Sequence, residues 1–505
     1  MAHNPERAQE FITDFFTLLP PSEFPQIWVT FAEVTTIPRP SGKEEQIADY
    51  VEAHGQVSRM EVSRDRHHNV LLVVPATEGF EDSPSILLQV HSDMVPEKDN
   101  DADLDPSLHG VRARVHDKEW VKADKTTLGA DNGMGLSVGL EILKDNRIRH
   151  GRLGLLVTTD EEKGLNGASK LELDLSGFRY LINLDSEEEG EATIGCAGAG
   201  YTDIEISLDT EPLGAYSLLD IGVGGLAGGH SGIEIGKGGA NGIKILAELL
   251  ASIPQSYDLR LVNITGGNVE KDIKNAIPQR GTATVAVKAE SLPEITYHLD
   301  KAGEMIKAGL AEFESGSFVF SHQESKQPYD RMLSKKSTDM IFDVTRSLPH
   351  GVYETKDGNV ITSTNLALIT IQDSRALISM MSRSAVGSSL EQMMEVIANK
   401  VKAHDSIRTR HLSRHAGWEP IYESTFIAIA GEIYRQVSGK GLQIKVTHGG
   451  LECGVIGEKF PHFIGNMISI GPTILDAHKT TERVHVPSVD RLYRYLTHLI
   501  EHLAA

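Results

Sequence analysis

The sequence predicts an α/β protein in which helices flank a mixed sheet and a smaller α+β domain is inserted into the chain. Short apolar runs alternate with helix-like stretches over the first 200 residues, and this pattern returns from about Gly417. Between the two parts, alternating strand patterns are interleaved with two helical patterns. A chain of 505 residues is also long enough to form two or more domains.

The first α/β part contains three predicted strands, each followed by polar residues. These strands are residues 84–90 (PSILLQV), 151–159 (GRLGLLVTT) and 179–184 (RYLINL), and a helix is predicted over 132–145. In open α/β sheets, ligands bind in the crevice beyond the carboxyl ends of the strands. We therefore expect the polar segments after these strands to lie close together.

The middle of the chain has a different order of predicted elements. Strand patterns such as YTDIEISL, TATVAVKA and ALISMMSR are interleaved with helical patterns near 239–252 and 388–403. The strand NMISIGP and the helix VDRLYRYLTHLIEHL belong to the second α/β part. The expected boundaries are 1–199 for the first α/β part (with 1–22 as an amphipathic helical extension), 200–413 for the inserted domain and 414–505 for the second α/β part.

Composition excludes several classes of protein. With 49 basic and 71 acidic residues the net charge is −22, which argues against nucleic acid or an anionic membrane as the main partner. No stretch approaches the roughly 18 unbroken apolar residues of a transmembrane helix, and the N-terminus does not resemble a secretory signal. The two cysteines, Cys196 and Cys453, are too few for a disulfide framework. We expect a soluble, cytoplasmic protein.

Five residues carry the chemistry that most needs an explanation: His91, Asp131, Glu162, Asp185 and His478. Singly, each has an ordinary structural explanation. An Asp between glycines caps a helix, paired glutamates after a strand form a solvated loop, an Asp at a strand end occupies a turn, and a histidine is one of 21. Together they form a ligand set suited to zinc, manganese or cobalt.

The strings LLQVHSDMVPEK, TTLGADNGMG, TTDEEKGLNGA, LDSEEEGEATIGCAG, GGHSG, KNAIP, HGGLECG and the terminal ERVHVPS occur in this order. They resemble the aminoacyl-histidine dipeptidases, also called cytosol non-specific dipeptidases, of the dinuclear zinc carboxypeptidase and dipeptidase family. The resemblance runs from about residue 23 to the C-terminus. It implies hydrolysis of the peptide bond of dipeptides, with Xaa-His dipeptides among the candidate substrates, by a metal-activated water.

The resemblance also implies a role for each residue of the site. His91 and Asp185 are expected to hold one of two divalent ions, Glu162 and His478 the other, and Asp131 both. Zinc is the first expectation for the metal, with manganese or cobalt as alternatives. Three further features are implied: Asp93 orients His91, Glu161 acts as the general base, and the peptide bond between Asp131 and Asn132 is cis.

The inserted domain is implied to be a lid that also forms a homodimer. His230 in GGHSG is expected to stabilise the oxyanion, from its own chain or from the partner's. Asn275 and Arg383 are expected to bind the substrate's carbonyl and C-terminal carboxylate, and Glu452 its free amine. The ordinary structural explanations are a loop histidine for His230, a surface turn for Asn275 and a strand-end ion pair for Arg383. The residues before His478 differ from the sequence that is usual in the family, which leaves His448 and His485 as competing candidates for this metal ligand.

Two other functions remain open at this point. A related tripeptidase or N-acyl amino acid deacylase would use the same dinuclear site, and a catalytically silent binding protein would retain the fold. The silent alternative is disfavoured because Glu161 and all five ligands are present. A nucleotide enzyme and a serine hydrolase are disfavoured because the glycine-rich GVGGLAGG lacks GxGxxG spacing and there is neither a P-loop nor GxSxG.

Overall fold

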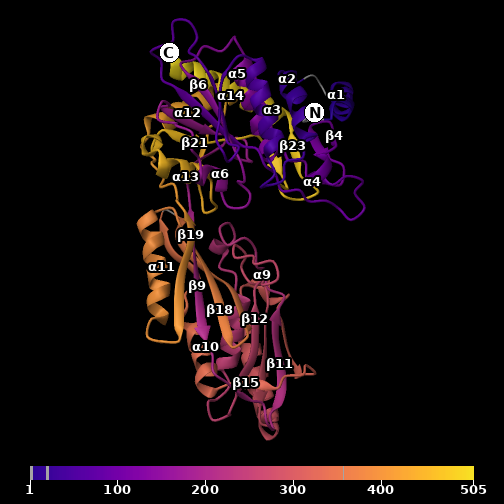
Figure 1. The fold of residues 1–505 in the computed structure, drawn as a ribbon, viewed down its shortest axis with the longest axis vertical. Helices are drawn as coiled ribbons and strands as arrows, with labels where there is room; N and C mark the ends of the chain where they lie inside the picture. The colour runs from indigo at the N-terminus through magenta and orange to yellow at the C-terminus, as the bar shows by residue number, and fades with distance from the viewer. Residues whose placement is uncertain (1–3, 19–21, 357) are drawn as a thin grey trace. The chain divides into compact units, whose positions relative to one another are not determined.

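The computed structural model describes residues 4–18, 22–356 and 358–505. They form two compact units (Figure 1): unit 1 comprises Met1–Cys196, Trp418–Val446 and Leu451–Ala505, and unit 2 comprises Ala197–Gly417 and Thr447–Gly450. Of the extension predicted over 1–22, residues 1–3 and 19–21 lie outside the described residues. Within the described part of the chain, no helix is both long and apolar enough to cross a membrane.

Unit 1 is built on an eight-stranded mixed sheet whose inner strands β6, β3, β7 and β21 are parallel. In spatial order the strands are β1 (Glu61–Arg64), β2 (Val70–Val74), β6 (Leu153–Thr158), β3 (Ile86–His91), β7 (Tyr180–Asn183), β21 (Met467–Ser469), β8 (Glu191–Cys196) and β20 (Gln443–Thr447). The predicted α/β class with a mixed sheet is confirmed.

The inner strands are buried along their whole length, as their continuous apolar sequences require. Such runs are typical of parallel strands covered by helices on both faces. The helices of unit 1 are α1 (Pro5–Leu18), α2 (Pro25–Thr35), α3 (Glu45–Val57), α4 (Pro106–His109), α5 (Ala130–Lys144), α6 (Asn166–Ser169), α12 (Thr425–Ser438), α13 (Glu452–Lys459) and α14 (Val486–Ala504). The predicted strands and the predicted helix over 132–145 correspond to β3, β6, β7 and α5.

A second, four-stranded sheet in unit 1 consists of β22 (Ile474–Leu475), β23 (Arg483–His485), β5 (Trp120–Ala123) and β4 (Ala113–His116). The loop between β22 and β23 contains His478. Helix α1 is the described part of the predicted N-terminal extension, and its Phe15 stacks on Trp28 of α2 with ring centroids 4.6 Å apart. Helix α1 is therefore packed against α2 within unit 1.

Unit 2 is an α+β structure with an antiparallel sheet (Figure 1). Its main strands are β14 (Val319–Glu324), β11 (Ser217–Gly224), β13 (Gly281–Val287), β12 (Arg260–Gly266), β17 (Asn359–Gln372), β18 (Arg375–Ser384), β9 (Gly198–Ser207) and β19 (Ile407–His415), with β16 (Gly351–Lys356) beside β17 and a separate pair, β10 (Thr210–Pro212) and β15 (Arg331–Leu333). Its helices are α7 (Gly242–Ala251), α8 (Leu292–Gly309), α9 (Glu312–Ser315), α10 (Lys335–Ser347) and α11 (Gly387–Val401).

Candidate metal centre

Three parallel strands bring acidic and histidine side chains to one edge of the unit 1 sheet. His91 is the last residue of β3, Asp185 follows β7 by two residues, and the loop after β6 contains Glu161 and Glu162. Because β3 pairs with both β6 and β7 in parallel register, their carboxyl ends lie side by side. The convergence predicted from the strand pattern is present in the structure.

Asp131 reaches the same place from the start of α5. Asp131 and Asn132 have non-helical backbone angles, and the peptide bond between them is cis, as expected. Asn132 also donates a hydrogen bond to Asp185 through its side-chain amide. The start of the helix and the end of β7 are therefore tied together at the site.

Asp131 lies between the two predicted histidines. Its Oδ1 is 3.0 Å from His91 Nε2 and its Oδ2 is 3.2 Å from His478 Nε2. Each histidine has a second acidic neighbour: Asp185 Oδ1 lies 3.1 Å from His91 Nε2, and Glu162 Oε1 lies 2.9 Å from His478 Nε2. The structure thus brings all five predicted ligand residues together in two groups that share Asp131.

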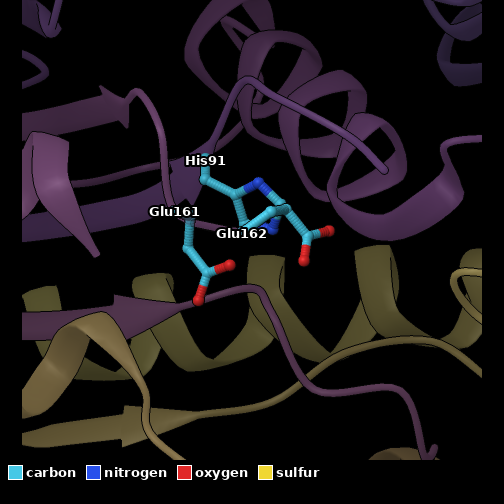
Figure 2. A group of neighbouring side chains, drawn as sticks. All are labelled: His91, Glu161 and Glu162. Carbon is cyan, nitrogen blue, oxygen red and sulfur yellow. The ribbon is translucent and has the colours of Figure 1, made fainter. Parts of the chain in front are cut away.

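The adjacent glutamates are held by a third carboxylate. Asp93 accepts the backbone N–H of Glu161 at 3.1 Å and that of Glu162 at 3.2 Å, and its Oδ1 lies 3.4 Å from His91 Nδ1. Figure 2 shows the two glutamate carboxylates pointing in different directions beside the His91 ring. His91, Glu161 and Glu162 also offer atoms close enough to surround one ion, so both glutamates are within reach of a metal held at His91.

The electrostatics of this group reflect a surplus of buried acids. Burial raises the pKa of Glu161 well above its ordinary value, and the neighbouring charges of Asp185 and Glu162 raise it further. Hydrogen bonds to Asp131 and then Glu162 raise the pKa of His478 to about 11. Burial would lower the pKa of His91, but the charge of Asp185 and the hydrogen bond to Asp131 outweigh it and raise that pKa well above its ordinary value. The site favours added positive charge.

The donor set fits two divalent cations. Two imidazole nitrogens and three carboxylates are ligands for zinc, manganese or cobalt. His91 Nε2 faces acidic oxygens of both Asp131 and Asp185 at about equal distance, and a single N–H cannot point well at both. Divalent cations held by these residues would accept the histidine lone pairs and offset the charge of the buried acids, and Asp131, which faces both histidines, would be shared.

The predicted lid residues lie in unit 2, and two of them are in contact. Arg383 Nη2 is 3.4 Å from His230 Nε2, and the Arg383 side chain is buried. Asn275 belongs to the neighbouring segment, because its backbone carbonyl accepts the N–H of Ser231 at 2.7 Å. His230, Asn275 and Arg383 therefore occupy one region of unit 2.

Glu452 has different surroundings from those its predicted role assumes. It begins α13 in unit 1, is fully buried, and its Oε2 accepts hydrogen bonds from Gln89 Nε2 and Thr158 Oγ1, both at 2.6 Å. Its carboxylate therefore offers no accessible surface to a substrate amine in this arrangement. Of the competing histidines, His448 belongs to unit 2, where it bonds Ser363 at 2.7 Å, and His485 lies beside Trp120.

Two residues that sequence reasoning missed contact the ligand-bearing loops. Glu482 accepts backbone N–H groups around Asp131, and the buried Arg39 donates to carbonyls beside His91. Both ionisable side chains are almost completely buried, and residues of these types are rarely buried unless they have partners. Glu482 is the first residue of the ERVHVPS string, so its position, though not its role, was part of the family resemblance.

A parallel-stranded α/β unit that gathers two histidines and three carboxylates at its strand ends defines a metal-dependent hydrolase. The chain belongs to peptidase family M20/M25/M40, whose model matches residues 87–502. It is 35% identical over 483 residues to the cytosol non-specific dipeptidase of Escherichia coli strain K12, covering 95% of this chain and 98% of that protein. The resemblance found in the sequence is confirmed.

Solved structures agree on the fold. The aminoacylhistidine dipeptidase from Vibrio alginolyticus has a TM-score of 0.84 and 31% identity, covering 95% of this chain and 97% of that one. Aminopeptidase PepT from Bacillus cereus ATCC 10987 has a TM-score of 0.58 at 15% identity, covering 96% of this chain and 100% of that one. The second likeness concerns the fold alone.

Proposed function

We propose that this protein hydrolyses the peptide bond of dipeptides with two divalent metal ions, zinc being the first candidate and manganese or cobalt the alternatives. The observation that carries the proposal is the placement of Asp131, one oxygen of which faces His91 and the other His478. The proposed ligands are His91, Asp131 and Asp185 for one ion and Asp131, Glu162 and His478 for the other. The activity named for the curated relative supports the choice of dipeptides.

Two bound divalent cations would polarise the scissile carbonyl and make water more acidic. In the proposed mechanism Glu161 takes a proton from the attacking water and delivers it to the leaving amine as the C–N bond breaks. Burial raises the pKa of Glu161, which suits a group that must first accept and then donate a proton. Asp93 holds the backbone of Glu161 and faces His91 Nδ1, so it would fix both residues.

Unit 2 is proposed to act as a lid and as the surface of a homodimer. His230 would donate to the oxyanion, Asn275 would bind the substrate carbonyl, and Arg383 would hold the C-terminal carboxylate. The contact between His230 and Arg383 supports a shared substrate site, and the rigid guanidinium fork suits a carboxylate. A cytoplasmic location is also proposed, in keeping with the name of the curated relative.

A substrate panel tests this function. The metal-loaded protein is assayed with a dipeptide, its C-terminal amide, a tripeptide and an N-acyl amino acid, and the free dipeptide is expected to have the highest kcat/KM. Losing the C-terminal charge should reduce kcat/KM by about 30-fold or more, as expected for one partner of a buried charge pair. A higher kcat/KM for the tripeptide or for the acyl amino acid would contradict the dipeptidase proposal.

Arg383→Ala gives the matched measurement. The variant should lose most of the preference for the free acid over the amide, whereas Arg375→Ala, an exposed arginine of the same strand, should keep it. An undiminished preference in Arg383→Ala would remove this residue from the substrate site.

Subunit exchange between inactive His230→Ala and inactive Glu161→Ala chains tests the dimer. A mixed dimer can recover activity only if His230 of one chain acts on the site of its partner, because only then does one site have both Glu161 and a working His230.

A further inference from the structure

The turn that precedes α5 is held by a single buried carboxylate. Glu482 Oε2 accepts the N–H groups of Leu128 at 2.7 Å and Gly129 at 3.0 Å, and its Oε1 accepts those of Ala130 at 2.8 Å and Asp131 at 3.3 Å. A carboxylate has about four acceptor positions, so all of them are used. Because Glu482 is only 2% exposed, water cannot replace these bonds.

Arg39 holds the same turn from its carbonyl side. This fully buried guanidinium donates to the carbonyl of Gly129 and, through Nη1, to the carbonyls of Ser92 and Asp93, both at 2.9 Å. Ser92 and Asp93 directly follow His91 at the end of β3. Arg39 therefore connects the turn that carries Asp131 with the loop that carries His91.

Two glycines make this close approach sterically feasible. A Cβ at Gly129 would lie 2.5 Å from Arg39 Nη2, and one at Gly133 would lie 2.6 Å from the same atom. Gly129 also has a φ of +69°, which disfavours other residues. The glycines of LGADNGMG thus leave room for Arg39.

From this geometry we infer that Glu482 and Arg39 are positioning residues that fix the backbone of Asp131, so that its two oxygens face both metal positions at once. The inference rests on the proposed dinuclear function. A shift of the 128–131 backbone would move both Asp131 oxygens together, so a weakened turn should affect both metal ions. Loss of an ordinary ligand to one position would weaken mainly that ion.

The test compares Glu482→Gln with the matched substitution Glu119→Gln. Glu119 is exposed and lies between β4 and β5, in the four-stranded sheet that also contains β23, the strand directly after Glu482. A glutamine amide would face two of the four N–H groups with its own donors, removing about half of the bonds. Zinc affinity is measured by chelator competition, together with thermal unfolding of the metal-free and zinc-loaded proteins. Glu482→Gln should bind both ions about 10- to 100-fold more weakly, and the rise in Tm on adding zinc should shrink.

A purely structural role gives a different result. It would lower the Tm of the metal-free and loaded forms equally and leave zinc affinity unchanged, which overturns the inference. If wild type and Glu119→Gln also fail to bind two ions, the proposed dinuclear function itself is contradicted, and not only the role of Glu482. Should Glu482→Gln not fold, Glu482→Asp and Arg39→Lys provide the same measurement, because each retains the charge but not the set of bonds. Wild-type zinc affinity in both would equally overturn the inference.

Discussion

The two halves of the candidate metal centre differ in how they are supported. The His91 side chain is 1% exposed and comes from the middle of the sheet, between β6 and β7. The His478 side chain is 48% exposed and comes from the loop between β22 and β23, where its backbone φ is +64°. One histidine is fixed by strands on both sides, whereas the other is presented from the surface.

This difference predicts that the two metal positions differ in their affinity for the ion and in how readily the ion exchanges. Removing a buried histidine leaves Asp131 and Asp185 facing each other in a site that water enters poorly, and uncompensated buried charge is strongly unfavourable. Around His478, water can take the place of the imidazole. The buried position should therefore bind its ion more tightly, and the exposed one should exchange its ion more readily.

The largest expected effect is that of metal removal. Complete chelation should lower kcat/KM at least about 1,000-fold, because several kcal/mol of transition-state stabilisation is lost. With a graded series of chelators, elemental analysis should find one ion leaving well before the other. Full activity in metal-free protein would contradict the proposed function, and simultaneous loss of both ions would contradict the comparison between the two halves.

The adjacent glutamates should separate by function. Glu161→Gln should retain both metal ions and lower kcat at least about 100-fold, the usual scale for a lost general base. Glu162→Gln should lose the ion on the His478 side. Metal content and single-turnover rates measured on the same preparations check both statements. The opposite pattern would exchange the two roles, which the closeness of both carboxylates to His91 allows.

The two histidines provide the direct comparison. His91→Ala should weaken the binding of its ion about tenfold more than His478→Ala weakens the binding of the other ion. Water can replace the exposed imidazole of His478 but not the buried one of His91, and the expected difference is similar to the loss caused by removing one residue that supports a metal ligand. Titration with zinc after chelation measures both affinities. His485→Ala serves as the control, because His485 lies beside Trp120 and outside the metal-binding groups found among the described residues. Equal losses at the two positions would remove the distinction drawn from burial.

The last expected effect concerns stability, not metal binding or activity, and it involves Glu452. Burial raises the pKa of this carboxyl from 4.5 to about 8. A raised folded-state pKa means that the protonated acid stabilises the fold fully below about pH 4.5, and that this contribution is lost as the pH rises to about 8. Glu452→Gln should lack this decline and exceed wild type at pH 8 by at most about 4 kcal/mol in the free energy of unfolding.

Denaturant unfolding at pH 5 and pH 8 measures this difference. Glu458→Gln, an exposed position of the same helix, is the control and should follow the wild-type pH dependence. Identical slopes for Glu452→Gln and wild type would mean that Glu452 is ionised in the folded protein at both pH values.

Much of the site could be predicted because its determinants are local in the sequence. The apolar runs that end at His91, near Glu161 and near Asp185 specify buried parallel strands, and parallel strands place their carboxyl ends at one edge. The contact between His91 and Asp131 follows from that edge once α5 packs beside β3. Family resemblance, rather than spacing, selected His478 from the competing histidines.

Tertiary structure alone decided the contacts between residues far apart in the chain. Glu452 is separated from Gln89 by 363 positions, and the hydrogen bond between them buries a carboxyl that the sequence suggested for substrate binding. Glu482 lies 351 positions from Asp131, yet it holds the backbone there. Periodicity determines which face of an element is buried, because that depends on neighbours along the chain. The partner of a buried charge depends on which distant segments fold together, and no local pattern encodes it.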